Sequence, residues 1–340
     1  LVARGGYFVG PVAVGYAMLT PRRLPMTPST LFDVASITKP VAATTVALSL
    51  LEEGRLHLED PLVEFVPEFG RPPEGRTEEA EWRRGVTLRH LLTHTAGVSA
   101  GRNLRKEGVR DREGIVAAVC ATPLNAPPGS RVEYSCFGYI LLGAALERIA
   151  GQDLDRLARE RVFAPLGMRD TGYRPDPALR ERIAATELDP ETGEILWGVV
   201  HDENARSMGG VSGNAGLFST APDLAVFGRM YLNGGVWRDQ RILAAATVAA
   251  AIRDHTGPLG APRGLGWVVR GTTPASSAGD LISPRAFGHT GFTGTSLWMD
   301  PDRDLIVVLL TNRVHPTREN RVMDRLRPLF HNAVLAAVTG

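Results

Sequence analysis

The stretch that most constrains this chain is residues 31–53, LFDVASITKPVAATTVALSLLEE. Small or apolar residues occupy nearly every side of a helix drawn through it, and a helix that is apolar all round lies inside a protein. Gly54 follows two glutamates and is a typical helix stop signal. Pro40 is tolerated if the helix begins near Ser36, because the first four N–H groups of a helix have no intrahelical partner. The sequence therefore predicts a loop that turns into a buried helix, with Ser36 at its N-terminus.

Lys39 lies three residues after Ser36, and residues at this spacing share a helix face. A serine hydroxyl is a poor nucleophile until a neighbouring base takes its proton. A buried lysine can serve as that base, because burial lowers its pKa from a reference value of about 10.4. The helix N-terminus also favours negative charge that develops beside it. We predict that Ser36 is a nucleophile and that Lys39 activates it.

Composition strengthens this interpretation of the Ser-x-x-Lys spacing. The chain holds 38 lysines and arginines together, yet only Lys39 and Lys106 are lysines. Arginine does not deprotonate in proteins, so lysine is kept where a removable proton matters. The alternative is that Lys39 only caps the helix or pairs near its start.

The overall composition excludes several classes of protein. The 340 residues are 44% hydrophobic, enough for one large domain or two interlocked ones. The net charge is +1 with 22% charged residues, which gives no basic field for nucleic acid or anionic membrane. Cys120 and Cys136 make neither a disulfide framework nor a metal motif. No run of 18 apolar residues is present, so we expect no transmembrane segment.

The start of the chain bears on its compartment. Position 1 is leucine and already belongs to a predicted strand, so we expect that the N-terminus is cut and that any export signal was lost with it. The compartment therefore stays open: a soluble protein of the cytoplasm, or an exported one. The oligomeric state is open as well.

Strand and helix patterns alternate in blocks along the chain. Residues 1–19 predict a hairpin that turns at Gly5-Gly6, and short strands are predicted at 264–270, 286–291, 295–300 and 305–311. Helices are predicted at 87–95, 111–122, 137–150, 152–170, 222–251 and 318–338. Strands at both ends predict an α/β chain of the α+β type, with one antiparallel sheet flanked by helices. We assign residues 1–58 and 262–340 to this sheet domain and residues 59–261 to a mostly helical region inserted between them.

Tyr134 follows the turn-forming Pro127-Pro128-Gly129 and precedes a predicted helix. A tyrosine in such a place usually packs its ring and leaves its hydroxyl wet. Beside Ser36 and Lys39 it would instead be a second proton-transfer group.

Three other patterns suggest different chemistry. Residues 97–101 fit Gly-x-Ser-x-Gly, but the strand that should precede a nucleophile at Ser99 is not predicted there. The glycine-rich residues 209–216 lack the Gly-Lys-Ser/Thr ending of a phosphate-binding loop. His201 and Asp202 form a pair without further ligands at metal spacing, so we predict no metal site.

Three motifs taken together resemble a known family. They are Ser36-Ile37-Thr38-Lys39, Tyr134-Ser135-Cys136 and Gly288-His289-Thr290-Gly291. In this order and separation they resemble the serine β-lactamase and penicillin-binding protein superfamily, in its class C-like branch, which includes esterases and D-amino-acid peptidases. The segments LFDVASITKP, LLTHTAGV, PPGSRVEYS and GHTGFTGTSLWMDP are similar too, so the resemblance covers nearly the whole chain.

The resemblance implies a β-lactamase/transpeptidase-like fold with the site in a cleft, and it requires no metal or organic cofactor. It implies that Ser36 forms an acyl-enzyme, that Lys39 activates it and that Tyr134 relays protons to the leaving group. The backbone N–H groups of Ser36 and Phe292 match the oxyanion hole. Substrate-binding positions of the family match Cys136, His289, Thr290 and Gly291, and a strand glycine such as Gly291 often admits a close approach.

Two departures from the family pattern bear on the substrate. Cys136 replaces the usual asparagine amide with a weak S–H donor. His289 replaces a lysine and is largely neutral near pH 7, at a reference pKa of about 6.5. Both favour a serine hydrolase that cleaves carboxylic esters over one that cleaves β-lactams. The alternatives are a β-lactamase or a D-amino-acid or cell-wall peptidase with the same chemistry, and a catalytically dead binding protein.

Overall fold

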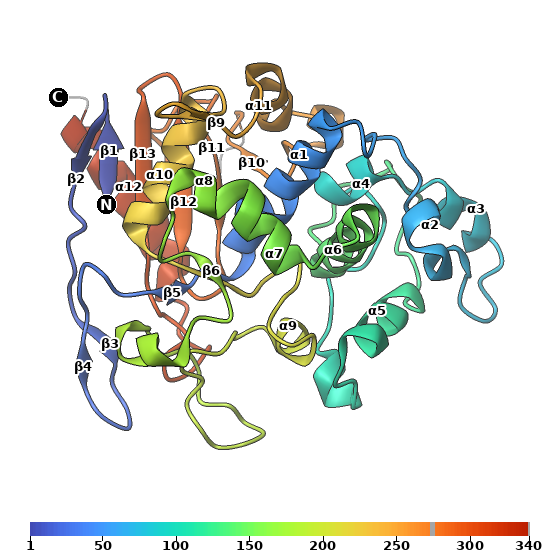
Figure 1. Cartoon of the computed structure of the whole chain (residues 1–340), viewed down its shortest axis with the longest axis horizontal. Coiled ribbons are helices and arrows are strands. Elements are labelled where there is room, and N and C mark those ends of the chain that lie inside the picture. Colours follow the sequence, from blue (N-terminus) through green and yellow to red (C-terminus); the bar gives the residue numbers. More distant parts are fainter. Residues whose placement is uncertain (273–275, 339–340) are drawn as a thin grey trace.

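The computed structural model describes residues 1–272 and 276–338, and its largest sheet has six antiparallel strands in the order β10-β11-β12-β13-β1-β2, in the left half of Figure 1. The strands are β1 (Val2–Arg4), β2 (Tyr7–Val9), β3 (Tyr16–Met18), β4 (Leu24–Pro25), β5 (Phe32–Asp33), β6 (Gly172–Tyr173), β7 (Leu217–Ser219), β8 (Val236–Trp237), β9 (Gln240–Arg241), β10 (Val268–Val269), β11 (Phe287–Thr290), β12 (Ser296–Asp300) and β13 (Leu305–Leu309).

Both ends of the chain build this sheet. Strand β1 pairs with β13 in the register Val2↔Val307, and β13 pairs with β12 in the register Ile306↔Met299. The turn at Gly5 joins β1 to β2, which forms one edge. The predicted antiparallel sheet from the two chain ends is therefore confirmed.

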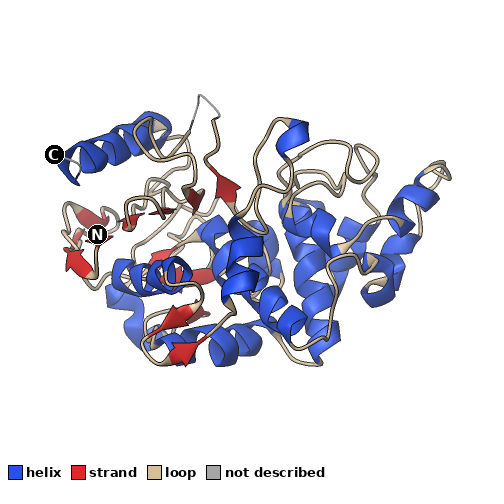
Figure 2. Ribbon diagram, turned by 90° about the horizontal axis from the view of Figure 1, so that it is seen from above, coloured by secondary structure: helices blue, strands red, loops and turns tan. Residues whose placement is uncertain are grey.

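Helices cover both faces of the sheet and fill the rest of the molecule. They are α1 (Thr45–Glu52), α2 (Leu62–Phe65), α3 (Glu79–Arg84), α4 (Leu88–Leu92), α5 (Arg112–Cys120), α6 (Cys136–Ala150), α7 (Leu154–Ala158), α8 (Ala164–Leu166), α9 (Glu203–Ser207), α10 (Ala221–Leu232), α11 (Ala245–Ile252) and α12 (Val322–Val338). Figure 2 shows α12 on one side of the strands and most other helices on the opposite side or beside them.

Both faces of the sheet are apolar. Successive side chains of a strand point to opposite faces, so each strand contributes apolar side chains to both. Trp298 and Val307 point to α12 and pack with Leu335. Their neighbours Met299 and Ile306 point the other way, into the main core, where a Cβ added at Gly228 of α10 would meet both. Burial on both faces explains why these strands read as nearly continuous apolar runs.

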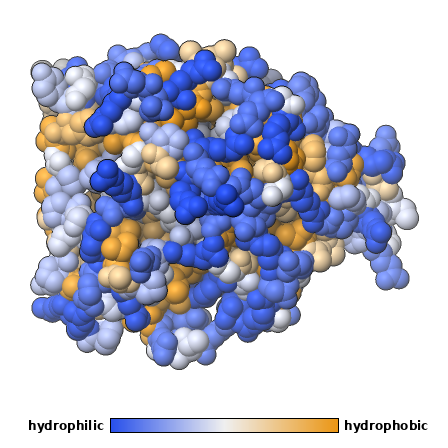
Figure 3. Space-filling model, in the orientation of Figure 1, coloured by the Kyte–Doolittle hydropathy of each residue, from blue (hydrophilic) through white to orange (hydrophobic). Residues whose placement is uncertain are grey.

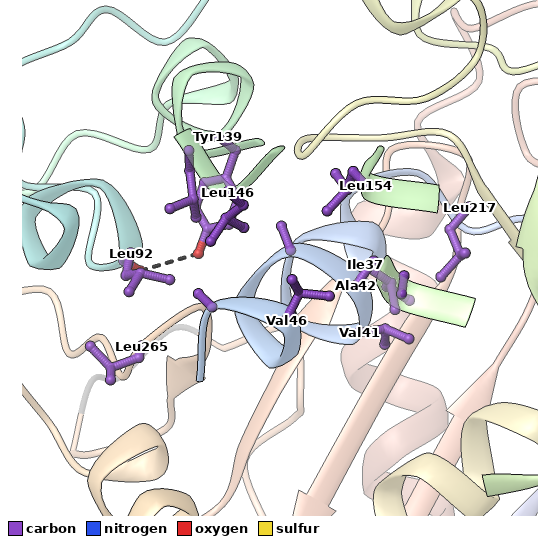
Figure 4. Close-up of a cluster of buried hydrophobic side chains, with 14 of the residues drawn as sticks. Ile37, Val41, Ala42, Val46, Leu92, Tyr139, Leu146, Leu154, Leu217 and Leu265 are labelled. Atoms are coloured by element: carbon purple, nitrogen blue, oxygen red, sulfur yellow. Dashed lines mark hydrogen bonds between the residues drawn. The ribbon is translucent and has the colours of Figure 1, made fainter. Parts of the chain in front are cut away.

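The main core surrounds the segment that leads from β5 into α1. Val41, Ala42 and Val46 are fully buried and meet side chains from α4, α6 and α7 (Figure 4). The Tyr139 hydroxyl of α6 donates to the Leu92 carbonyl at 3.2 Å, which ties α6 to the end of α4. The prediction of a helix buried on all sides is confirmed.

The same segment is not one regular α-helix. A 3₁₀ turn, η1 (Ala35–Ile37), carries Ser36, and a π-helix, η2 (Lys39–Thr44), precedes α1. Pro40 lies within the first two residues of η2, where its missing N–H is tolerated.

The predicted helix at 222–251 is wrong as a single element. Gly234 and Gly235 both take positive φ, end α10 and start the short β8–β9 hairpin before α11 begins. The apolar spacing on both sides of the break hid it from the pattern. The division of the chain into domains at residues 59 and 262 stays a prediction.

The face of the molecule in Figure 3 is mostly hydrophilic, with apolar patches between polar side chains. Tyr7 and Val9 of the edge strand β2 are among the most exposed large apolar residues, at 80% and 68%. Within residues 1–272 and 276–338, no helix has the length and apolar character needed to cross a membrane.

Candidate active site

Ser36 is presented by a strained turn that follows directly from β5. Ala35 takes a left-handed φ of 48°, which is unusual for a residue with a side chain. The Asp33 carboxylate holds this turn, because Oδ1 accepts the Ala35 N–H at 2.8 Å and Oδ2 accepts the His201 N–H at 2.7 Å. Backbone strain of this kind concentrates at functional sites.

Lys39 is fully buried and its amine lies against Ser36. The Nζ atom donates to Ser36 Oγ at 3.0 Å, to the Asn214 carbonyl at 3.1 Å and to Cys136 Sγ at 3.5 Å. An ammonium has three N–H donors, and protein acceptors surround all of them. The amine is therefore fixed beside the Ser36 hydroxyl before any substrate arrives.

Tyr134 completes this group from the loop before α6. Its ring centroid lies 4.8 Å from Lys39 Nζ, and Lys39 and Ser36 both act to lower the pKa of its hydroxyl. Ser135 caps α6 by accepting the Gly138 N–H at 2.8 Å, so the tyrosine comes at the helix start. The structure thus brings together the three side chains that the sequence analysis selected.

His94, which the sequence analysis did not select, holds the Tyr134 loop. Its carbonyl accepts the Glu133 N–H at 2.8 Å, its Nδ1 accepts the Ser135 N–H at 3.1 Å, and its ring lies 4.5 Å from the Tyr134 ring. Burial is the largest cause that lowers the pKa of His94, so the ring is neutral and can accept this bond.

The pKa values of Lys39 and Tyr134 are both raised above their usual values. Burial is the largest influence on the pKa of Lys39 and lowers it. Attraction to the Cys136 sulfur and the Tyr134 oxygen raises it by more in total, so the pKa lies above its usual value. Burial raises the pKa of Tyr134 and outweighs the opposing effect of Lys39. The expectation that burial alone decides the pKa of Lys39 is therefore wrong, because its partners are polar.

His289 and Thr290 end β11 beside this group. Burial lowers the pKa of His289 to about 3, so the ring is neutral at physiological pH. Its Nδ1 lies 2.8 Å from the Thr290 carbonyl, which can only accept, so Nδ1 carries the proton. Nε2 is buried without a partner among the described residues, and the Tyr134 ring lies 5.9 Å away.

Gly291 is required by packing inside the protein. A Cβ at this position would overlap the Thr295 hydroxyl and the Val34 carbonyl. Gly291 therefore makes room for the turn that carries Ser36, and because it also lines the cavity, its place beside the substrate stays a prediction.

The amides of Ser36 and Phe292 lie on the same cavity and are free. Neither N–H donates a hydrogen bond to any residue in the described part of the chain. The Thr293 hydroxyl donates to the Asp33 carbonyl at 2.7 Å and so ties the Phe292 turn to the Ser36 turn. Two unpaired amides beside a serine are what an oxyanion hole needs.

One cavity of about 750 Å³ joins these groups to solvent. Its lining includes Ser36, Tyr134, Cys136, Arg263 and residues 289–292. Ser99 is not in its lining; the Ser99 carbonyl instead accepts the Ser135 hydroxyl at 2.6 Å. This placement disfavours Ser99 as the nucleophile.

Comparison with known proteins now decides the family. A model of the Beta-lactamase family matches residues 1–331. The chain is 36% identical over 312 residues to a putative D-alanyl-D-alanine carboxypeptidase of Escherichia coli K12, covering 85% of this chain and 70% of the relative. It is 33% identical over 367 residues to the protein of the same name from Salmonella agona, covering 100% and 83%. The chain belongs to the Beta-lactamase family.

Several solved structures share the fold of this chain. An octameric penicillin-binding protein homologue from Pyrococcus abyssi has a TM-score of 0.74 at 24% identity, covering 99% of this chain and 72% of that one. EstCE1, a hydrolase with promiscuous acyltransferase activity, has a TM-score of 0.73 at 24% identity, covering 96% and 92%. A family VIII carboxylesterase has a TM-score of 0.69 at 21% identity, covering 93% and 87%.

This Beta-lactamase-family member is an enzyme, a serine hydrolase, which argues against the hypothesis of a binding protein without catalysis. Its site also depends on residues that the sequence analysis did not assign to it. Asn214 supplies a carbonyl to Lys39, while its side chain contacts Ser212 at 2.7 Å and Asp202 at 3.2 Å. No local sequence signal marks Asn214, because it acts through its backbone carbonyl and lies 175 residues from Lys39 in the sequence. His201 Nε2 lies 3.0 Å from a Glu187 carboxylate oxygen. The His201 ring is therefore held by a side chain of the protein, which explains its place beside Asp202 without a metal.

Proposed function

We propose that Ser36 is the nucleophile of an acyl-transfer hydrolase and that its preferred substrates are small carboxylic esters. The observation that carries the proposal is the contact of 3.0 Å between Lys39 Nζ and Ser36 Oγ, with the Tyr134 ring centroid 4.8 Å from the same nitrogen. The free amides of Ser36 and Phe292 support it, because both residues line the same cavity.

In the proposed reaction, Ser36 Oγ attacks the substrate carbonyl carbon and its proton passes to the Lys39–Tyr134 pair. The two amides hold the negative oxygen that forms. The tetrahedral intermediate collapses, Tyr134 returns a proton to the leaving oxygen, and the alcohol departs. Water then attacks the acyl-enzyme by the same proton route and releases the acid. The pair must first have lost one proton, because both pKa values are raised.

Two observations support an ester as the scissile group. Cys136 offers a thiol where an amide would hold a peptide-like substrate carbonyl. His289 is neutral, so the strand beside the substrate supplies no cation. One of the similar structures is a carboxylesterase.

A peptidase is the second candidate. Its support is the name of the curated relatives, putative D-alanyl-D-alanine carboxypeptidases. Arg263, which lines the cavity, adds a cation that the sequence analysis had not counted.

The test compares three substrate classes with one protein preparation: short-chain p-nitrophenyl esters, a chromogenic cephalosporin, and peptides with a D-residue next to the scissile bond. We expect the esters to have the highest kcat/KM. Efficient turnover of the cephalosporin or the peptides without ester hydrolysis would contradict the ester preference.

A serine-reactive phosphonate then locates the nucleophile by mass spectrometry. We expect the adduct on Ser36, in the wild type and in Ser99→Ala alike. An adduct on Ser99, or none on any serine, would overturn the proposal.

A further inference from the structure

Residues 7–16, YFVGPVAVGY, form an apolar stretch at the surface of the protein, which we call the β2 segment. It consists of strand β2 and the chain that follows it, and it holds no charged residue. Its large apolar side chains all reach solvent: Tyr7 is 80% exposed, Phe8 41%, Val9 68%, Val12 81%, Val14 79% and Tyr16 41%. A surface of this kind needs a physical explanation, because apolar side chains gain free energy when they leave water.

The exposed area of the β2 segment is comparable with one side of a protein interface. A full aromatic side chain presents about 150–250 Å², so these six side chains leave on the order of several hundred Å² of apolar surface in water. The largest apolar patch of a typical monomer covers about 300–600 Å². A stable interface buries about 800 Å² on each partner, so the β2 segment can supply most of one side.

Strand β2 is also an open edge of the six-stranded sheet. Among the strands that the structure describes it pairs with β1 alone, and it lies at the left margin of Figure 1. The N-terminal amine of Leu1 donates to the Val308 carbonyl, and the Val308 N–H donates back to the Leu1 carbonyl. Because hydrogen-bonded pairs alternate along an antiparallel ladder, Ala3 also turns its backbone groups toward β13, and Val2 turns its own toward β2.

Phe8 therefore carries the outward backbone groups of this edge. It lies opposite Ala3 in the ladder, so its N–H and C=O point away from β1. Within residues 1–272 and 276–338, no other segment supplies a partner to them. Proteins usually protect such an edge with charged residues, a proline within the strand or a covering element. Tyr7-Phe8-Val9 has no charge and no proline, and all three side chains are exposed.

We propose that the β2 segment is an interface between two copies of this chain, in which β2 pairs antiparallel with the β2 strand of the second copy. A two-fold axis at Phe8 lets its N–H donate to the carbonyl of Phe8 of the partner subunit, and symmetry supplies the reverse bond. Tyr7 then lies opposite Val9 of the partner subunit, in a pair whose side chains are close. The two sheets become one continuous sheet.

The chemistry of the segment favours a second copy as the occupant. A two-fold axis brings identical residues together, and like charges directly opposite each other would repel. The β2 segment carries no charge, so this repulsion is absent. A lipid surface is favoured by basic residues around the apolar ones, and the segment has none. The N–H and C=O of Phe8 also need a strand as partner, which a lipid surface does not provide.

This interface leaves the active site open in both copies. In the sheet order, three strands separate β2 from β11, which carries His289. No residue of the β2 segment lines the cavity. The proposal goes beyond the proposed function and does not depend on it. A monomeric variant should keep the ester turnover of the wild type, so failure of one proposal leaves the other to be decided by its own measurement.

Sedimentation equilibrium tests the proposal directly. We expect the wild type to form a dimer with twice the chain mass of 36.6 kDa. Phe8→Pro removes an N–H that points to solvent in the single chain, a position at which an edge strand tolerates proline. The same change removes the donor of both bonds between the copies. The dimer dissociation constant should therefore rise by about 10- to 100-fold, as expected for two lost hydrogen bonds.

The register gives a second test. Val9→Lys and Tyr7→Glu each place an unpaired charge in the interface and should each weaken the dimer by about tenfold or more. The double variant with both changes places opposite charges across the axis twice. It should bind about tenfold more tightly than either single variant, because opposite charges stabilise cross-strand pairs. Thermal melting of each variant checks that the chain is folded.

Val322→Lys is the matched control, since Val322 is a valine at the start of α12 that is 55% exposed. Its dimer dissociation constant should stay within about twofold of the wild type, the usual outcome for a surface substitution away from an interface. A monomeric wild type would overturn the proposal, and so would a dimer that Phe8→Pro and Val9→Lys leave unchanged. Weak dimers in both single variants without recovery in the double variant would contradict the pairing of Tyr7 with Val9. A monomeric wild type that floats with lipid vesicles, and loses this in Val9→Lys, would assign the segment to a membrane surface instead.

Discussion

Lys39 and Arg263 both lie beside the Tyr134 ring, and they differ in how many hydrogen-bond acceptors the protein supplies to their charged groups. Lys39 forms the inner end of the site: it is fully buried beside the cavity-lining Ser36, and its amine lies 3.0 Å from Ser36 Oγ and 3.1 Å from the Asn214 carbonyl. The guanidinium of Arg263, on the cavity wall, has no carboxylate or carbonyl acceptor among the described residues and lies 5.7 Å from the centre of the Tyr134 ring. A group that performs chemistry must be held in place before the substrate binds, whereas a group that recognises a ligand keeps its hydrogen bonds for the ligand. The pattern of satisfied and unsatisfied groups therefore separates the reacting end of the site from the recognising end.

Ser36→Ala tests the inner end most severely. Removal of the hydroxyl leaves no atom to form the acyl-enzyme, so we expect kcat to fall by about 10⁴-fold or more, as for other nucleophilic serines. The measurement is turnover of a p-nitrophenyl ester. Ser99→Ala is the control and should keep wild-type turnover, because Ser99 is not in the cavity lining. Loss of activity in Ser99→Ala with activity retained in Ser36→Ala would reverse the assignment.

Lys39→Arg keeps the charge and removes the ability to lose a proton. We expect damage nearly as large, about 10³-fold or more in kcat, because arginine cannot act as a base and its planar head does not fit three separate acceptors. Thermal melting of the variant checks that the fold survives. If most activity remains, lysine is not the base, and the inner end serves only for electrostatic support.

Tyr134→Phe removes a hydroxyl and keeps the ring between the two cations. We expect a loss of about 10²–10⁴-fold in kcat, the usual contribution of one acid–base group. The ring contacts with Lys39 and Arg263 stay in this variant, so the loss measures the hydroxyl alone. A variant that keeps the wild-type rate would show that the Tyr134 hydroxyl takes no part in proton transfer.

The mildest change to the reacting end is a change of pH, which alters the protonation of Lys39 and Tyr134 without a substitution. The pKa values of Lys39 and Tyr134 are both raised, so the pair loses a proton only as the pH rises. Activity should therefore increase with pH through the neutral range, by up to about tenfold per unit below the pKa of the pair. His289, with a pKa of about 3, adds no change at neutral pH. A profile that is flat from pH 6 to 9 would show that the reactive pair is already deprotonated at neutral pH.

The local sequence determined much of this protein. The Ser36–Lys39 spacing, the apolar helix after it, the turn before Tyr134 and the strand signals at both ends each depend on neighbours within a few residues, and the sheet and buried helix are confirmed. The break at Gly234 was missed, because apolar spacing on both sides outweighed two glycines. The π-helical geometry of η2 was missed because residue types alone do not distinguish it from an α-helix.

Only the tertiary structure decided the rest. The carbonyl of Asn214, the loop-holding His94 and the unpaired Arg263 reach the site from distant parts of the chain. It also decided that Gly291 makes room for the Ser36 turn and that the pKa of Lys39 rises despite burial. These properties depend on which groups meet in space, and a sequence pattern records only which groups are adjacent along the chain.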